Sequence, residues 1–182
     1  MFLTLFLTHE NLLLHPFRAD DLARYDQLAE QIFKILSDDE TLRFIPEKRL
    51  LSIAAAKQWL NGAIINLHSG RNSIHFITCK NTGALVGIVD IIPPAVAKEY
   101  YHWHHYPFFI EFYLDANEKD KAIMTSLLPL IVADLKQQGI QHIAAVINRK
   151  NIAARKVLGK SGFIYAAAFD PIQDFYELTY SD

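Results

Sequence analysis

The feature that most constrains the fold is a pair of β-type runs separated by a helical pattern. Phe108–Leu114 is rich in aromatic and branched residues, and His142–Ile147 is a second strand-like run. Between them, apolar residues from Ile123 to Leu135 recur at the spacing of an amphipathic helix that ends near Gly139. A strand–helix–strand connection within one sheet runs both strands in the same direction, so this segment predicts a parallel pair.

An antiparallel hairpin is predicted earlier in the chain. Ser73–Cys79 and Leu85–Ile92 are rich in β-type residues, and the five residues that join them form a short turn containing glycine. Pro93 and Pro94 end the second strand, because proline donates no hydrogen bond to a ladder. A hairpin and a parallel pair in one domain require a mixed sheet.

The remaining segments add strands and helices on both sides of this centre. The N-terminal apolar runs around Thr8–Asn11 predict strand up to Pro16. Further helices are expected from Asp20 or Asp21 to Leu36, from Ser52 to Gly70 and over Asn151–Ser161, and further strands over Phe163–Phe169 and Asp174–Tyr180. The order is strand, two helices, three strands, helix, strand, helix and two strands, which predicts one α/β domain over residues 1–182.

Composition narrows the classes of function. A formal net charge of −2 gives no electrostatic case for nucleic-acid binding. The apolar start lacks the basic leading region of a signal peptide, and no run reaches the length of a membrane span, so we expect no membrane association and a cytoplasmic location. The one cysteine, Cys79, excludes an internal disulfide and is expected to be buried and inert within its strand.

Three stretches carry a resemblance to a known family. They are Asn11–Phe17 followed by Asp20-Asp21-Leu22; Phe76-Ile77 through Asn81-Thr82-Gly83-Ala84-Leu85-Val86-Gly87; and Asn151-Ile152-Ala153-Ala154 followed by Val157-Leu158, Lys160 and Gly162-Phe163. In this order they resemble the GNAT acetyltransferase superfamily, and specifically its branch of ribosomal-protein N-terminal acetyltransferases. The third stretch is the most specific, and His15 stands where the family usually has arginine.

The resemblance implies a GNAT-like fold, a mixed six- or seven-stranded sheet flanked by about four helices. It also implies an enzyme that moves an acetyl group from acetyl-CoA to a primary amine of a small molecule or peptide. In the family, the strands placed here at Phe108–Leu114 and His142–Ile147 splay apart around the coenzyme. The coenzyme pyrophosphate lies at the N-terminus of the intervening helix, where unpaired N–H groups and the helix dipole favour an anion.

The coenzyme loop of the family aligns with the residues before that helix. Its basic position falls on Lys119 and its last small position on Ala122, and the cofactor-binding segment includes Lys121 and Ile123. Asp120 replaces the usual central glycine, which lets backbone N–H groups approach the phosphates closely. Because a carboxylate repels phosphate, we expect the two flanking lysines to offset its charge.

Other implied site residues lie on the strands and on the last helix. Glu111 stands alone in an apolar run, where a charge is costly unless it is paired or solvated, so we predict that it faces the cleft as general base or acceptor-binding group. A backbone N–H near Tyr113 or Leu114 would polarise the thioester oxygen. Asn151 would contact the pantetheine arm or simply cap its helix, whereas Ala154 replaces a serine that can protonate the leaving thiolate.

Several alternatives stay open. His102, His104 and His105 suggest a metal site, but no clear carboxylate or cysteine completes the set, so no metal is expected. These histidines, with Tyr100, Tyr101 and Trp103, either line the acceptor side or cover the sheet. The final strands are candidates for pairing across a homodimer. Asp120 and Ala154 also fit a protein that keeps the fold as a binding or interaction module without transfer.

Overall fold

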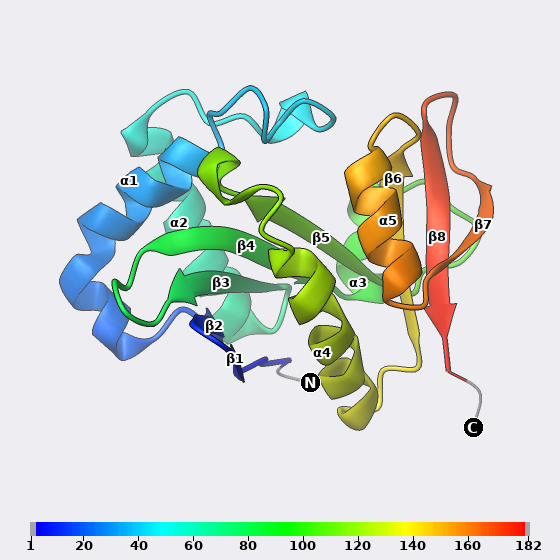
Figure 1. The fold of residues 1–182 in the computed structure, drawn as a ribbon, viewed down its shortest axis with the longest axis horizontal. Coiled ribbons are helices and arrows are strands. Elements are labelled where there is room, and N and C mark those ends of the chain that lie inside the picture. The colour runs from blue at the N-terminus through cyan, green and yellow to red at the C-terminus, as the bar shows by residue number, and fades with distance from the viewer. Residues whose placement is uncertain (1–2, 181–182) are drawn as a thin grey trace. The chain divides into compact units, whose positions relative to one another are not determined.

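The structure is a computed structural model that describes residues 3–180, and it has a mixed α/β fold (Figure 1). Within these residues there are eight strands and five α-helices. The strands are β1 (Leu7–His9), β2 (Leu12–Pro16), β3 (Ser73–Cys79), β4 (Leu85–Ile92), β5 (Phe108–Leu114), β6 (His142–Asn148), β7 (Ile164–Ala168) and β8 (Gln173–Thr179). The helices are α1 (Tyr25–Ile35), α2 (Ile53–Ser69), α3 (Pro94–Tyr100), α4 (Ile123–Gln137) and α5 (Ile152–Lys160). The strand order in the sheet is β1-β2-β3-β4-β5-β6-β8-β7.

The chain divides into two compact units, each described by itself. The first comprises Met1–Asp90 and Phe112–Lys121, and the second Ile91–Glu111 and Ala122–Asp182. The strands β4 and β5 contribute residues to both units. The expectation of one domain over the whole chain stays a prediction.

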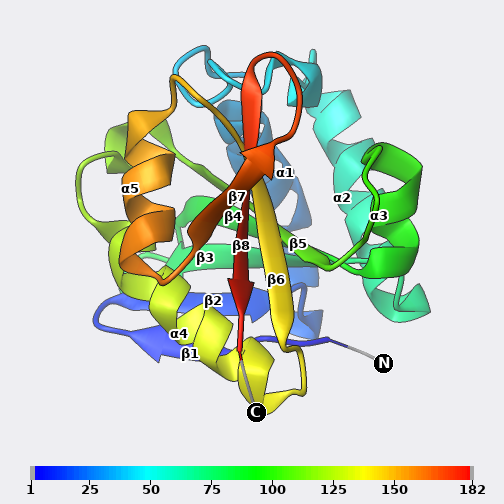
Figure 2. The ribbon, with the colours of Figure 1, turned by 90° about the vertical axis from the view of Figure 1, so that its right-hand side faces the viewer.

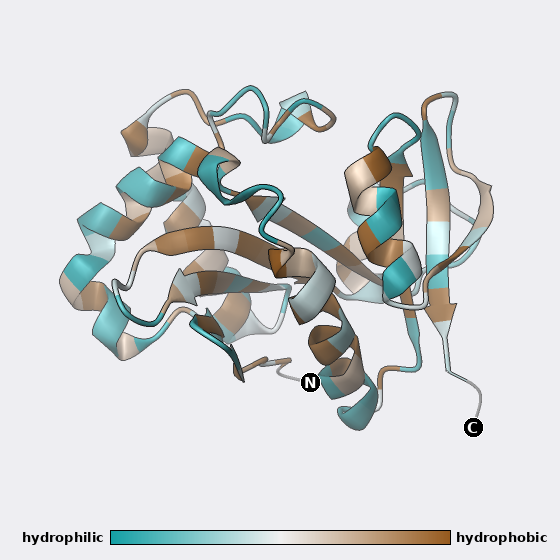
Figure 3. Cartoon of the chain, viewed as in Figure 1, coloured by the Kyte–Doolittle hydropathy of each residue, from teal (hydrophilic) through white to brown (hydrophobic). Residues whose placement is uncertain are grey.

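The first unit packs α1 and α2 onto antiparallel strands. The strand β2 pairs with β1 on one side and β3 on the other. Figure 3 shows hydrophilic residues interleaved with hydrophobic ones along α1, whose buried face carries Leu28, Ile32 and Ile35. These side chains share a core with residues of α2 and β3. The α2 helix begins where predicted, because Ser52 Oγ accepts a hydrogen bond from Ala55 N at 3.1 Å.

The second unit contains the predicted parallel pair. The β5 and β6 strands are parallel, with Phe108 opposite Ile143 and Phe109 opposite Ala144. On its other side β6 pairs antiparallel with β8 along its whole length. Figure 2 shows α5 and α3 on opposite sides of β6 and β8. An aromatic core with Phe109 and Phe175 lies on the α3 side.

Four expectations need correction. The sheet has eight strands instead of six or seven, because the N-terminal runs form a hairpin that turns at Glu10, whose φ is 48°. A fifth helix, α3, was missed because Pro94 ends β4 and also occupies the first helical turn, a position that proline favours. The first helix is preceded by a 3-10 turn over Ala19–Arg24, so Leu22 is exposed and does not join the apolar face.

The fourth correction concerns Cys79, which is partly exposed and not buried. Hydrogen bonds from the Thr82 hydroxyl and from the backbone N–H groups of Thr82 and Asn81 hold the pKa of its thiol below the usual range. The Asn11 side chain also donates to its sulfur, at 3.1 Å. A thiol in such surroundings is more ionised than a buried one, so inertness is not expected.

No helix among residues 3–180 is both long and apolar enough to cross a bilayer.

Candidate active site

The end of β5 is held firmly within the first unit. The Leu114 carbonyl accepts a hydrogen bond from Thr41 Oγ1 at 2.9 Å, and Asp115 N donates to Val86 O at 3.0 Å. The Asp115 side chain accepts from Asn117 N at 2.9 Å and forms an ion pair of 2.5 Å with Lys34 Nζ. Burial alone would raise the pKa of Asp115, but these partners outweigh burial and lower it. The strand therefore enters the loop before α4 from a fixed position.

Two residues of the loop before α4 have the positive φ that glycine adopts most readily, although neither is glycine. Asp120 has a φ of 60° and Ala122 a φ of 57°, both in the left-handed region. These are the two positions that align with small residues in the family loop. A residue with a Cβ in this region costs roughly 1–2 kcal/mol, and aspartate tolerates it better than most. Both positions thus have the left-handed backbone that glycine adopts most readily, although neither residue is glycine.

The N-terminus of α4 presents backbone donors. Ala122 is the N-cap residue, and its side chain provides no capping hydrogen bond. The first helical bond runs from Ser126 N to Ala122 O at 3.0 Å, so the N–H groups of the preceding turn point out of the helix end. Ile123, the first residue of the helix, is buried. Such a helix end favours an anion.

Each of the two lysines that flank Asp120 lies beside a glutamate. Lys119 Nζ lies 3.5 Å from Glu40 Oε2, and Lys121 Nζ lies 3.0 Å from Glu118 Oε2. Both lysine side chains are exposed, and ion pairs at the surface contribute little. The two lysines therefore remain available to a stronger anion, while Glu40 and Glu118 add to the negative charge that they were expected to offset at Asp120.

Glu111 lies on β5 and is partly exposed in the second unit. Its Oε1 accepts a hydrogen bond from the Tyr101 hydroxyl at 2.6 Å. Between residues 108–111 of β5 and the strand β6, only Phe108 and Phe109 have a paired residue. The ladder has therefore ended before Glu111, which agrees with strands that separate toward their carboxyl ends.

The α5 N-terminus shows the capping role of Asn151 directly. Its Oδ1 accepts a hydrogen bond from Ala154 N at 3.1 Å. Ala154 is buried, and its methyl group has no proton to donate. The adjacent Arg155 donates from Nε to the Tyr176 hydroxyl at 2.9 Å, which ties α5 to β8.

Comparison with known proteins agrees with this geometry. The family model described as "Acetyltransferase (GNAT) domain" matches residues 11–164. The chain belongs to the GNAT acetyltransferase family. No curated protein matched the sequence.

Solved structures share the fold over nearly the whole length. The ribosomal-protein-S5-alanine acetyltransferase from Vibrio fischeri is 17% identical, with a TM-score of 0.71 and 98% of each chain covered. A GNAT-family acetyltransferase from Bacillus anthracis is 14% identical, with a TM-score of 0.69, covering 96% of this chain and 98% of the other. The microcin C7 self-immunity acetyltransferase MccE, in complex with acetyl-CoA and AMP, is 15% identical, with a TM-score of 0.70 and 94% of each chain covered. At these identities the similarity establishes the fold.

The aromatic residues between α3 and β5 of this GNAT chain cover the sheet. Tyr101 stacks on Phe109 with ring centroids 4.1 Å apart, and Trp103 stacks on Phe175 at 5.1 Å. His102 and His104 are exposed, and the side chain of Tyr100 lies outside the described residues. His105 lies close to His142 and Glu177.

Sequence reasoning missed two features of this GNAT chain. From sequence, Tyr101 was expected only to line the acceptor side or to cover the sheet. Its hydrogen bond to Glu111 depends on the path of the chain between α3 and β5, which the sequence pattern does not give. Glu177 was not connected with the histidines, because it follows them by more than 30 residues in sequence. The spacing of Glu177 and Phe175 on β8 was the available signal, because residues two apart on a strand lie on the same face.

Proposed function

We propose that this protein is an N-acetyltransferase that moves an acetyl group from acetyl-CoA to a primary amine by direct attack, with general-base assistance. The observation that carries the proposal is the start of α4. There, backbone donors without a side-chain cap follow a loop whose residues 120 and 122 adopt the left-handed backbone of a glycine-rich phosphate loop. Membership of the acetyltransferase family supports the same reaction class.

In this proposal the loop holds the coenzyme pyrophosphate. The backbone N–H groups of Lys121, Ala122 and Ile123 donate to phosphate oxygens, and Lys119 exchanges its surface pair with Glu40 for the stronger anion. Asp120 opposes binding through its charge. The affinity for acetyl-CoA is therefore expected to be lower than a glycine at residue 120 would allow.

The α5 helix contributes the contact to the pantetheine arm. The Asn151 side-chain oxygen is used as a helix cap, so its amide N–H groups are the part that serves the pantetheine carbonyls. Ala154 provides no proton for the leaving thiolate. Protonation of the thiolate by solvent or by another side chain is then required.

Glu111 is proposed as the general base. Bound acetyl-CoA supplies the acetyl group as a thioester. The Glu111 carboxylate removes a proton from the acceptor ammonium or amine, and a backbone N–H near Tyr113 or Leu114 donates to the thioester oxygen as negative charge develops there. The Tyr101 hydroxyl donates a hydrogen bond to Glu111 Oε1 and so orients the carboxylate.

The second candidate function is a GNAT-fold binding or interaction module without transfer. Asp120 in the phosphate loop and the carboxylate partners of Lys119 and Lys121 favour it, because each reduces the attraction for a pyrophosphate. The two functions differ in a measurable way. The enzyme releases CoA in the presence of an amine, whereas the module does not.

The test of the catalytic role is Glu111→Gln, which keeps the size of the side chain and removes its basicity. We expect kcat to fall by about 10²–10⁴-fold, with the dissociation constant of CoA unchanged. Glu30→Gln, which alters an exposed glutamate of α1, is the matched control and should keep full activity. Full activity in Glu111→Gln would remove Glu111 from the mechanism.

A further inference from the structure

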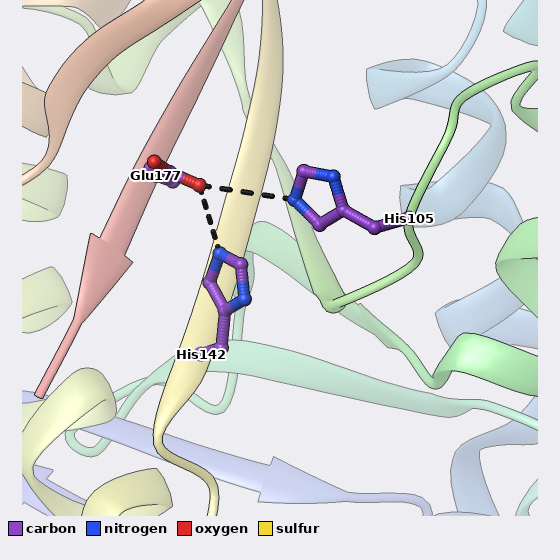
Figure 4. A group of neighbouring side chains, drawn as sticks. All are labelled: His105, His142 and Glu177. Atoms are coloured by element: carbon purple, nitrogen blue, oxygen red, sulfur yellow. Dashed lines mark hydrogen bonds and ion pairs between the residues drawn. The ribbon is translucent and has the colours of Figure 1, made fainter.

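A cluster of two histidines and one carboxylate lies in the second unit, on segments far apart in sequence. His105 precedes β5, His142 begins β6, and Glu177 lies on β8. Figure 4 shows both imidazole rings directed at the same carboxylate. The His142 Nε2 atom is 2.9 Å from Glu177 Oε2, and His105 Nε2 is 3.9 Å from that same oxygen. One ligand atom from each residue lies within 4.8 Å of the others.

The strand register explains why these side chains meet. Glu177 is opposite Ala144 in the β6–β8 ladder, and His142 is two residues before Ala144. Because side chains alternate along a strand, His142 and Glu177 occupy the same face as diagonal neighbours. Tyr176, the neighbour of Glu177, receives the hydrogen bond from Arg155 of α5 and therefore belongs to the opposite face. The cluster thus lies on the α3 side of β6 and β8.

We propose that His105, His142 and Glu177 bind a divalent transition-metal ion of the zinc class. Imidazole nitrogen and carboxylate oxygen are the donors that such ions take in proteins, and three protein ligands leave a fourth position for water. Metal–ligand bonds of about 2.0–2.1 Å at tetrahedral angles place the ligand atoms about 3.3 Å apart. The distances from Glu177 Oε2 to His142 Nε2 (2.9 Å) and to His105 Nε2 (3.9 Å) fall on either side of that value. A small movement of His105 and Glu177 therefore completes the site.

A hydrogen bond alone explains only part of the arrangement. It accounts for His142 and Glu177, whereas His105 Nε2 is beyond hydrogen-bond distance of the carboxylate and still faces it. The rings of His105 and His142 stack with centroids 5.4 Å apart and an interplanar angle of 21°. Both Nε2 atoms consequently face one small volume beside Glu177 Oε2, and a cation there interacts with all three donors.

The bound ion would fix the connection between α3 and β5. His105 belongs to this connection, and so does Tyr101, whose hydroxyl donates to Glu111. Trp103 from the same connection packs on Phe175 of β8. A metal that ties His105 to β6 and β8 therefore stabilises the segment that orients the proposed base. The metal proposal stands on the cluster geometry, and only this last link rests on the proposed function.

Direct binding of zinc and cobalt(II) tests the site. The full chain, without a polyhistidine tag and stripped with a chelator, is titrated with ZnCl₂ in competition with a chromophoric chelator. We expect one equivalent to bind with a dissociation constant of about 1 μM or below, and cobalt(II) to give the visible absorption of a four-coordinate ion. Failure of the unmodified protein to bind either ion with micromolar affinity would overturn the proposal, and that result does not depend on any variant.

Substitutions locate the ion. His105→Gln, His142→Gln and Glu177→Gln should each weaken zinc binding by about tenfold or more, because each removes a ligand. His68→Gln, which changes an exposed histidine at the end of α2, should bind as the unmodified protein does. Circular dichroism checks that each variant is folded. Equal affinity in all four variants would place the zinc elsewhere and refute the assignment, whereas loss of acetyl transfer with normal zinc binding bears on the proposed function alone.

Discussion

The carboxylate of Asp120 gives the most informative perturbation of the proposed coenzyme loop. Asp120 is exposed, has a φ of 60°, and directly precedes the residues whose N–H groups begin α4. Its charge and its backbone conformation affect different quantities. The charge acts on a bound phosphate, whereas the left-handed backbone is present with or without a ligand.

The magnitudes follow from these two facts. Two unit charges about 5 Å apart in a water-exposed loop interact with about 0.8 kcal/mol, and a pyrophosphate carries about two charges. Removing the carboxylate is therefore worth about 1.5 kcal/mol, or about tenfold in the dissociation constant of CoA. The left-handed conformation costs aspartate or asparagine little, alanine about 1 kcal/mol, and glycine nothing.

Three substitutions separate the effects. We expect Asp120→Asn and Asp120→Gly to bind CoA about tenfold more tightly than the unmodified protein, and by similar factors. Asp120→Ala should show a similar gain in affinity for the folded protein but a lower melting temperature, because its Cβ is strained at a φ of 60°. Calorimetric titration at low salt measures affinity, and thermal unfolding measures stability. The gain should shrink at high salt. Unchanged affinity in both Asp120→Asn and Asp120→Gly would show that this carboxylate does not face the phosphates.

Further predictions concern the first unit. Gly87→Ala should lower the free energy of unfolding by about 1–3 kcal/mol in urea titrations, because its new Cβ would lie 2.7 Å from Leu114 Cδ2 and 2.9 Å from the Tyr113 carbonyl oxygen; unchanged stability would contradict this packing. Burial lowers the pKa of His75 to about 4, so the unfolded chain takes up a proton from about pH 6.5 and the folded chain does not. Stability should therefore fall by about 3 kcal/mol as the pH drops from 6.5 to 4, and a flat profile in urea titrations would refute the neutral buried state. Asp21→Asn should cost about 3–5 kcal/mol near pH 7, because it removes the anion that two arginines share. The cost should diminish below about pH 4, where the unfolded aspartate is protonated, and a pH-independent cost would contradict the ion pairing.

The basis of the last prediction is a buried polar cluster near the N-terminus. Asp21 is fully buried and accepts hydrogen bonds from the side chains of Arg18 and Arg24. Burial alone would raise the pKa of Asp21, but the hydrogen bonds from Arg18 and Arg24 lower it below its ordinary value. From sequence, Asp21 was named only as a possible start of the first helix and within the first stretch that resembles the family. The sequence did not predict this cluster, because it depends on the 3-10 turn that places both arginines beside one carboxylate.

Periodicity predicted the central elements well, because their patterns are long and bounded by strong signals. β3, β4 and β5 have the predicted residue ranges, and α2 lies between Ser52 and Gly70 as expected. The elements that were missed are short. The α3 helix is seven residues long and β1 is three residues long, so both are too short for a repeating pattern of apolar residues to identify them.

The sequence allowed individual residues of the candidate site to be named, but it did not predict how they are arranged. Asp120 was identified as a departure from the family loop, but its left-handed backbone is a property of the folded loop. The histidine positions raised a metal hypothesis that was set aside for want of a carboxylate. Glu177 supplies that carboxylate through the β6–β8 register, which no local pattern around the histidines reveals.

The most direct test of the central claim is a measurement of transfer itself. The purified protein is incubated with acetyl-CoA and a panel of small-molecule and peptide amines, and acetylated products and free CoA are quantified by mass spectrometry. Time-dependent formation of an acetylated amine, matched by free CoA and lost in Glu111→Gln, is the predicted result. Binding of acetyl-CoA with no acetylated product from any amine would contradict the enzyme and support the interaction module.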